Sequence, residues 1–277
     1  MRTERITGGD GANIVVYSFG AGPGIVILHG GGVQERDYHR LAKALADRFT
    51  VHLYNRRGRP DSAALTGTET IGTDIGDLAA VLDHTGARSV FGHSGGGFVA
   101  LRAGLSLPLE RIAVYDPGLS IMGRPRFAFL DELEEAVRAG DHVRAITIAG
   151  RAVTPDSPAA KLPSAVAALI SRLFLRTPIG RRFEALMPTI PPEVRRIAEH
   201  DGPATDYAGI TADVLLAAGA RSPRYFTENC EAVAAAIPCG RAIVIPGASH
   251  NTANIAPKRF VEPFAAFFAG GQVLEAP

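Results

Sequence analysis

The sequence predicts an α/β protein whose mostly parallel sheet is interrupted by a helical insertion. Short apolar runs that read as strands alternate with helical patterns up to Asp116. Strand patterns are then missing from about Pro117 to Gly209, and they return toward the end of the chain. Parallel strands need crossover connections, which helices supply, so the alternation indicates a sheet covered by helices on both faces.

Four apolar runs predict the strands of the first part of the sheet, over residues 12–19, 24–30, 48–55 and 88–94. The second run is continuously apolar, which is typical of a strand buried on both faces. Between the last two strands, a helix over 70–86 is indicated by apolar residues at helical spacing, namely Ile71, Ile75, Leu78 and Leu82.

The same pattern continues with a helix over 95–107 and a strand over 111–116. Three helical segments follow, separated by prolines and glycines, over residues 126–140, 141–153 and 164–176. Strands are predicted again at 212–219 and 240–247, and a last helix at 257–270. We therefore expect a core formed by residues 1–117 and 210–277, with a helical insertion over 118–209.

Composition excludes several classes of protein. The 277 residues are 46% hydrophobic and 21% charged with a net charge of +1, which is neither a fibrous nor a disordered composition and gives no bulk attraction to nucleic acid or membrane. No apolar run resembles a signal peptide or reaches the length of a membrane span, so a cytoplasmic protein is expected. Cys230 and Cys239 are the only cysteines and lack metal-ligand spacing, so we expect two free thiols and no metal.

A serine flanked by glycines is the first candidate for chemistry. The segment Gly92-His93-Ser94-Gly95-Gly96 fits G-x-S-x-G and lies between a predicted strand and a predicted helix. Small flanking residues allow a tight turn that exposes the Ser94 hydroxyl. The alternative is an ordinary serine-glycine loop, and a base and an acid elsewhere in the chain would decide between the two.

Several motifs together resemble the α/β-hydrolase superfamily, in its serine-nucleophile branch with a helical cap. They are "LHGGG" after an early strand, "NRRGRPDS" after the next, the serine turn, the helical insertion after "VYD", and "PGASHN" near the end. The resemblance covers nearly the whole chain. It implies an eight-stranded, mostly parallel sheet and a catalytic nucleophile, acid and histidine in that chain order, without a metal or organic cofactor.

His250 matches the histidine of that family. It follows the strand over 240–247, and the carboxyl ends of parallel strands share one edge of the sheet, so His250 is expected near Ser94. A neutral imidazole there can accept the serine proton and return it to a leaving group. His93 and His29 are interpreted as structural supports.

The acid departs from the family pattern, because the strand over 212–219 is followed by Ser222 where many relatives carry an aspartate. Asp116, at the carboxyl end of the strand over 111–116, is the best replacement. The alternative role for Asp116 is a strand-end carboxylate that binds loop amides. Asp213 begins its strand and should lie about 15 to 20 Å from the site. Weaker candidates are Glu228 and Asp206.

The glycine run after the second predicted strand supplies the last element. An oxyanion needs preorganised donors, and the resemblance implies the N–H of Gly95 plus one from this run. We expect this second donor to be the N–H of Gly31. Gly32 is the alternate, because with three consecutive glycines the motif does not fix which one matches the family's donor. The alternative is a merely flexible turn.

The sequence therefore favours a serine hydrolase that cleaves an ester, thioester or lactone. One alternative is C–C hydrolysis, lyase or cyclase chemistry on the same fold, and another is a non-catalytic ligand-binding protein. The substrate is expected to be a small apolar molecule, with no nucleic acid or membrane as partner. The insertion should cover the pocket and line it with Phe127, Phe129, Phe174 and Phe183.

Overall fold

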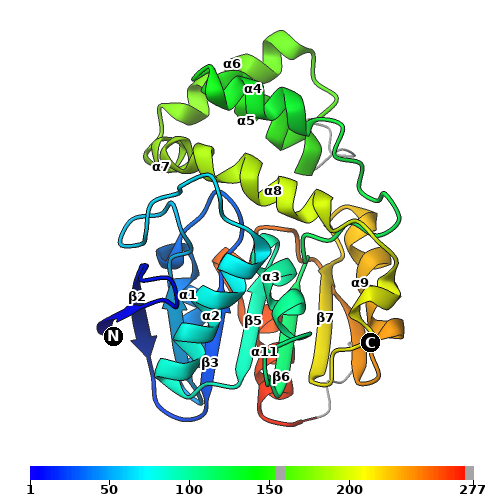
Figure 1. The fold of residues 1–277 in the computed structure, drawn as a ribbon. Helices are drawn as coiled ribbons and strands as arrows, with labels where there is room; N and C mark the ends of the chain where they lie inside the picture. The colour runs from blue at the N-terminus through cyan, green and yellow to red at the C-terminus, as the bar shows by residue number, and fades with distance from the viewer. Residues whose placement is uncertain (154–159, 272–277) are drawn as a thin grey trace.

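An eight-stranded sheet forms the centre of the molecule, with helices on both of its faces and a helical layer over one end (Figure 1). The computed structural model describes residues 1–153 and 160–271. The strands follow the spatial order β1-β2-β4-β3-β5-β6-β7-β8. Their bounds are Arg2–Thr7, Asn13–Phe19, Gly24–Leu28, Thr50–Tyr54, Ser89–His93, Arg111–Tyr115, Asp213–Gly219 and Gly240–Ile245 for β1 to β8.

The six strands from β4 to β8 in this order pair in parallel, whereas β1 and β2 are antiparallel to their neighbours. The eight-stranded, mostly parallel sheet implied by the resemblance is thus confirmed. All seven strands expected from sequence are present, and β1 is the one that was missed. As an edge strand, β1 pairs only with β2, so its sequence RTERIT needs no continuous apolar run.

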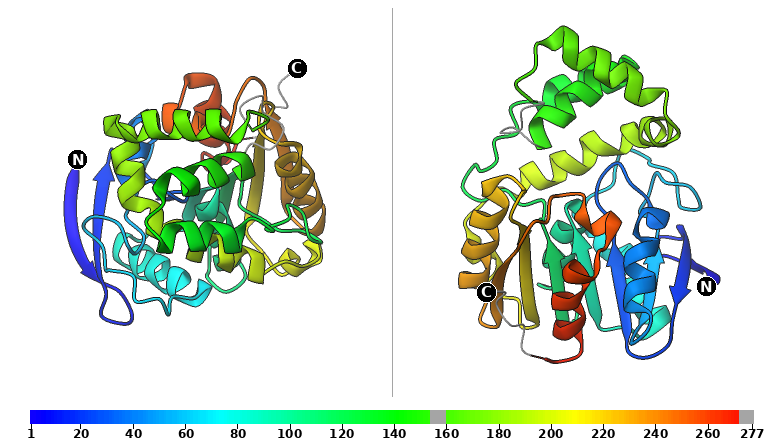
Figure 2. Two further views of the ribbon diagram at one scale, coloured as in Figure 1. Left: turned by 90° about the horizontal axis from the view of Figure 1, so that it is seen from above. Right: turned by 180° about the vertical axis from the view of Figure 1, so that it is seen from behind.

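The parallel strands β3 to β7 are buried on both faces, whereas the edge strand β8 is partly exposed. Along β3, Val26 and Leu28 join one core cluster and Ile25 and Ile27 join the other, which explains the continuous apolar run. The first cluster is covered by α2 (Ile71–Thr85), α3 (Gly95–Ala103) and α9 (Arg224–Ala236). The second is covered by α1 (His39–Leu45) and α11 (Lys258–Phe268), seen from behind in Figure 2.

The chain between β6 and β7 forms the helical layer. Its α-helices in the described ranges are α4 (Leu130–Arg138), α5 (His142–Val153), α6 (Ser164–Leu175), α7 (Pro178–Leu186) and α8 (Ile190–Glu199). The sequence predicted α4, α5 and α6 but not α7 and α8. The prolines of α8 read as breaks, yet they occupy its first turn, where a missing N–H costs nothing. Residues 154–159 of the expected insertion and 272–277 of the expected core lie outside the described residues.

Helix α8 is the part of the insertion nearest to the sheet. It contacts α3 below and α4 above, and the other insertion helices lie farther out (Figure 1). The outer helices have a small core of their own, formed by Leu133, Ala136, Ala145 and Met187. The element that faces the carboxyl edge of the sheet is therefore α8.

Residues 1–153 and 160–271 contain neither a membrane span nor a cluster of metal ligands. No helix there has the length and apolarity that crossing a bilayer requires. The same ranges hold no group of three or more histidine, cysteine, aspartate or glutamate side chains that could bind a metal ion.

A buried carboxyl group near β4 makes stability depend on pH. Glu35, in the 3-10 helix η1 (Glu35–Tyr38), is 8% exposed, and burial raises its pKa to about 7 from the usual 4.5. His39 Nε2 lies 3.3 Å from Glu35 Oε2, but burial lowers the pKa of His39, so a neutral His39 does not compensate Glu35. The charge of Arg36 acts in the opposite direction to burial but only partly offsets it. The folded protein therefore keeps a proton that the unfolded chain releases, and stability falls as the pH rises from about 4.5 to about 7.

Replacement of Glu35 by glutamine is expected to stabilise the protein at about pH 8 and to change little at about pH 4. Because water partly screens this carboxylate, we expect a gain of about 1 kcal/mol, or about 2–4 °C in melting temperature. Thermal unfolding at both pH values measures the difference. An equal shift at both would mean that glutamine acts through packing and not through the proton.

Candidate active site

Ser94 lies on a strained turn between β5 and α3. Its backbone has φ +52° and ψ −121°, a conformation that costs free energy in a residue other than glycine. Gly96 is required here, because a Cβ on it would lie 2.3 Å from the carbonyl oxygen of Leu28. A Cβ on Gly92 would similarly lie 2.5 Å from the carbonyl oxygen of Gly96. The tight turn predicted from the glycine spacing is thus present.

Asp116 follows β6 and is completely buried. Its Oδ2 accepts hydrogen bonds from His250 Nδ1 at 3.1 Å and from Ser222 Oγ at 2.5 Å. Its Oδ1 accepts one from the backbone N–H of Gly219 at 3.0 Å. A carboxylate is an acceptor only, so it satisfies all three donors when ionised. Asp116 thus contacts both the histidine and a backbone amide at the end of β7.

Ser222 accounts for the departure from the family pattern. It follows β7, which pairs in parallel with β6, so the ends of these strands bring Ser222 and Asp116 together. The hydroxyl at the position where an acid was expected thus binds the carboxylate one strand away. Asp213 begins β7 at the opposite edge, as expected, and Glu228 and Asp206 lie in α9 and in the 3-10 helix η3 (Ala204–Tyr207).

The imidazole of His250 is held from several sides. It stacks on the ring of Phe226 with centroids 5.0 Å apart and contacts the ring of His93 at 4.8 Å. The Tyr115 hydroxyl donates to the carbonyl oxygen of Ser249 at 2.6 Å and so fixes the preceding residue. Because Nδ1–H of His250 donates to Asp116, the neutral ring leaves Nε2 as its proton acceptor.

His93 supports this arrangement without competing with it. Gly30 N–H donates to the Tyr38 hydroxyl at 3.1 Å, and that hydroxyl in turn donates to His93 Nδ1 at 2.5 Å. Burial holds the pKa of His93 well below its usual value. A neutral His93 adds no positive charge beside His250, so it does not oppose formation of an imidazolium there.

The glycine run after β3 lies next to the serine turn. The nitrogen of Gly31 is 3.8 Å from the position that a Cβ on Gly95 would occupy. Gly95 begins α3, so its N–H has no acceptor within the helix. Gly32 is turned toward the insertion instead, because a Cβ on it would lie 2.6 Å from the ring of Phe183. Of the two glycines, Gly31 therefore lies beside Gly95, and Gly32 faces the insertion.

A pocket of about 330 Å³ joins these groups to the insertion. Ser94, His250 and Gly31 line it, together with the polar Asn251 and Asn254. The rest of its wall is mainly apolar and includes Val33, Ile146, Phe174, Phe183, Ile190 and Val194. The site is therefore a mostly apolar cavity with its polar groups gathered at one end.

Two of the four predicted lining phenylalanines, Phe174 and Phe183, line this pocket. The structure places Phe127 and Phe129 elsewhere. Phe127 packs against the core cluster beneath α2, α3 and α9, and Phe129 packs against the small core of the insertion. The sequence predicted a helix over 126–140, but α4 begins only at Leu130. Both phenylalanines therefore lie in a connecting segment, where helical spacing does not determine which way a side chain faces.

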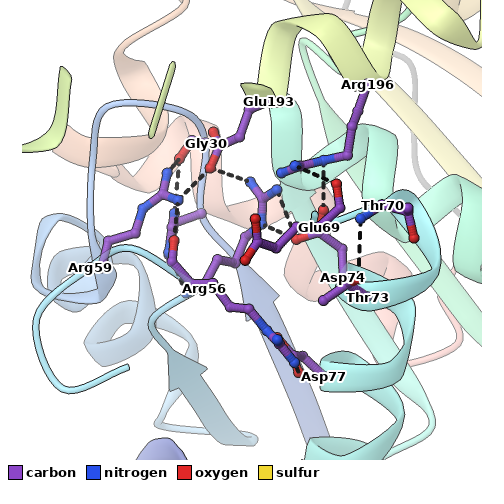
Figure 3. A network of polar contacts seen from close by, with 12 residues as sticks. Gly30, Arg56, Arg59, Glu69, Thr70, Thr73, Asp74, Asp77, Glu193 and Arg196 are labelled. Carbon is purple, nitrogen blue, oxygen red and sulfur yellow. Dashed lines mark hydrogen bonds and ion pairs between the residues drawn. The ribbon is translucent and has the colours of Figure 1, made fainter. Parts of the chain in front are cut away.

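A buried ionic cluster beside the glycine run was not predicted from the sequence. Arg56 and Arg59, within the "NRRGRPDS" motif after β4, form a buried ionic cluster with side chains of α2 and α8 (Figure 3). Arginines directly after a buried strand were a usable signal for such a cluster. Their partner Glu193 is distant in sequence, so the pairing itself left no local pattern.

Comparison with known proteins agrees with the fold. The profile of the alpha/beta hydrolase family matches residues 25–262. The chain belongs to this family. An alpha/beta hydrolase structure from Sphaerobacter thermophilus has a TM-score of 0.80 at 26% identity, over 96% of this chain and 100% of that one.

Curated relatives support a hydrolase of the esterase type. The sn-1-specific diacylglycerol lipase ABHD11 of Danio rerio is 26% identical over 257 residues, which are 88% of this chain and 77% of that protein. The pimeloyl-[acyl-carrier protein] methyl ester esterase of Aeromonas hydrophila is 32% identical over 121 residues, 43% of this chain and 45% of that protein. Like this esterase, several of the curated relatives are matched over less than half of their length.

Proposed function

We propose that this protein is a serine hydrolase that cleaves an ester, thioester or lactone of a small apolar substrate through an acyl-enzyme. Ser94 is the nucleophile, His250 the general base and acid, and Asp116 the carboxylate that orients the histidine. The hydrogen bond from His250 Nδ1 to Asp116 Oδ2, made beside the pocket that Ser94 lines, carries this proposal.

The reaction follows from these positions. Ser94 Oγ attacks the acyl carbon while Nε2 of His250 takes its proton, and the imidazolium is stabilised by the ionised Asp116. The N–H groups of Gly31 and Gly95 receive the oxyanion. His250 then protonates the leaving group as the tetrahedral intermediate collapses. Water, deprotonated by the same histidine, releases the acyl group and restores Ser94.

The substrate class follows from the wall of the pocket. The insertion acts as a cap whose Phe174 and Phe183 face an apolar acyl or alcohol group. About 330 Å³ is near the lower end of the usual range for ligand pockets, which favours short to medium chains. Relatives named as a lipase and as methyl ester esterases support an ester over the C–C bond of the alternative reaction.

A fluorophosphonate probe and a panel of p-nitrophenyl esters test the proposal. We expect one probe adduct, located on Ser94 by peptide mass analysis, and turnover that is fastest for short to medium acyl chains. Ester turnover without an adduct on Ser94 would contradict the mechanism. If the probe does not react and no ester is cleaved, the chain is a ligand-binding protein or an enzyme with another chemistry.

A further inference from the structure

Five charged side chains are buried together beside the glycine run, namely Arg56, Arg59, Asp74, Glu193 and Arg196 (Figure 3). Glu193 and Arg196 come from α8 of the insertion, and the others belong to the core. Burial alone would raise the pKa of Glu193, but the charges of Arg56 and Arg59 lower it below its usual value. Glu193 is therefore an ionised group inside the protein, which is tolerated only because it is paired.

Arg59 connects Glu193 to the glycine run. Its Nη1 donates a hydrogen bond to Glu193 Oε1. Its Nη2 donates to the carbonyl oxygen of Gly30 at 3.4 Å, and its Nε donates to that of Val33 at 3.2 Å. One rigid guanidinium thus joins the insertion to carbonyl groups on both sides of Gly31 and Gly32.

These contacts determine the direction of the Gly31 N–H. The Gly30 carbonyl also accepts a hydrogen bond from His29 Nδ1 at 2.8 Å, and His29 Nε2 accepts one from the N–H of Arg56 at 3.0 Å. In a trans peptide the N–H points opposite to the preceding carbonyl group. With the carbonyl held by Arg59 and His29, the N–H of Gly31 points away from them.

We propose that Glu193 is a positioning residue for the oxyanion-binding N–H of Gly31 and acts through Arg59. The inference rests on the proposed function, since it assigns Gly31 to the oxyanion. Glu193 itself touches neither substrate nor reacting atoms. It orients Arg59, Arg59 holds the Gly30 carbonyl, and the peptide plane transmits that orientation to the Gly31 N–H. The position of α8 is thereby coupled to the geometry of the catalytic loop.

A second buried ion pair of α8 provides a control that distinguishes positioning of the Gly31 N–H from simple attachment of the helix to the core. Arg196 also belongs to α8, and its Nε lies 3.2 Å from Asp74 Oδ2, while its Nη1 donates to the carbonyl oxygen of Glu69 at 3.4 Å. These contacts bind α8 to the core without reaching the glycine run. Arg196→Gln is consequently a matched control, because it removes a buried ion pair from the same helix.

The test compares three variants, Glu193→Gln, Arg59→Lys and Arg196→Gln. The substrate is p-nitrophenyl butyrate, and the inhibitor is butylboronic acid, which forms a tetrahedral adduct with Ser94. Loss of a whole oxyanion donor costs about 10²–10³ in kcat, and a displaced donor keeps part of its effect. For Glu193→Gln we expect kcat to fall about 10-fold with KM within about twofold, and boronate affinity to fall by the same factor as kcat. Arg196→Gln should lower the melting temperature and leave kcat within about twofold.

Arg59→Lys keeps the charge but cannot bind Glu193 and two carbonyl groups at once, so it should show the same selective loss of kcat. It also tests the inference if Glu193→Gln folds poorly. The double variant Glu193→Gln/Arg59→Lys should lose no more kcat than the more impaired of the two single variants, because both residues act through one path. Additive losses, or equal losses of kcat in Glu193→Gln and Arg196→Gln, would overturn the inference.

The failure of this inference is distinguishable from failure of the proposed function. Wild-type protein that is labelled on Ser94 and cleaves esters, with unchanged kcat and boronate affinity in Glu193→Gln and Arg59→Lys, contradicts only the role of Glu193. Wild-type protein that neither reacts with the probe nor cleaves an ester contradicts the function on which the inference rests.

Discussion

Replacement of Ser94 by alanine is expected to lower kcat for ester hydrolysis by about 10⁴-fold or more while the protein stays folded. Alanine keeps the Cβ of the strained turn and removes only the oxygen that we propose as the nucleophile. The surrounding glycines and the pocket wall are unchanged, so substrate binding should persist. Steady-state kinetics with p-nitrophenyl butyrate, together with thermal unfolding, measure the two effects separately.

Ser171→Ala serves as the control for this loss. Ser171 is a buried serine of α6 that lies outside the pocket wall, and its hydroxyl is 3.0 Å from Thr147 Oγ1, so alanine removes a hydrogen bond there. Its kcat should stay within about twofold of wild type, at a stability cost of about 1 kcal/mol. If Ser94→Ala retained more than about one hundredth of wild-type kcat, a covalent mechanism through Ser94 would be untenable.

Replacement of Asp116 by asparagine is expected to lower kcat by about 10³–10⁴-fold with little change in KM. The amide has nearly the shape of the carboxylate but only one acceptor oxygen. Both carboxylate oxygens accept hydrogen bonds, one from Gly219 and the other from Ser222 and His250. Whichever carboxylate oxygen is replaced, the NH₂ group of asparagine faces a hydrogen-bond donor. The variant also lacks the negative charge that would stabilise the imidazolium of His250.

Two further variants show whether that loss is specific. Ser222→Ala removes one donor to Asp116 but keeps the charge, so we expect about a tenfold or smaller loss of kcat. Asp213→Asn, at the exposed beginning of β7, should leave kcat unchanged. Full activity in Asp116→Asn would remove the assignment of the acid, and fluorophosphonate labelling of that variant would show whether Ser94 still reacts.

Local patterns in the sequence predicted most of the fold and part of the site. Seven of the eight strands follow from apolar runs. For β3 to β7 the reason is that a strand buried on both faces must be apolar along nearly its whole length. The serine turn follows from glycines that leave room for close backbone contacts. The place of His250 follows from strand order, since the carboxyl ends of parallel strands meet at one edge. The first two requirements act within a few residues, and the third follows from the parallel sheet that alternating strands and helices predict.

Only the tertiary structure decided which side chains meet. The hydrogen bond from Ser222 to Asp116 depends on the register of β6 against β7, and the orientation of Phe127 and Phe129 depends on the packing of a connecting segment. The pairing of Arg59 with Glu193 spans 134 residues. Such contacts are set by how separate elements pack, and a contact between distant segments imposes no period and no spacing on the residues around either partner.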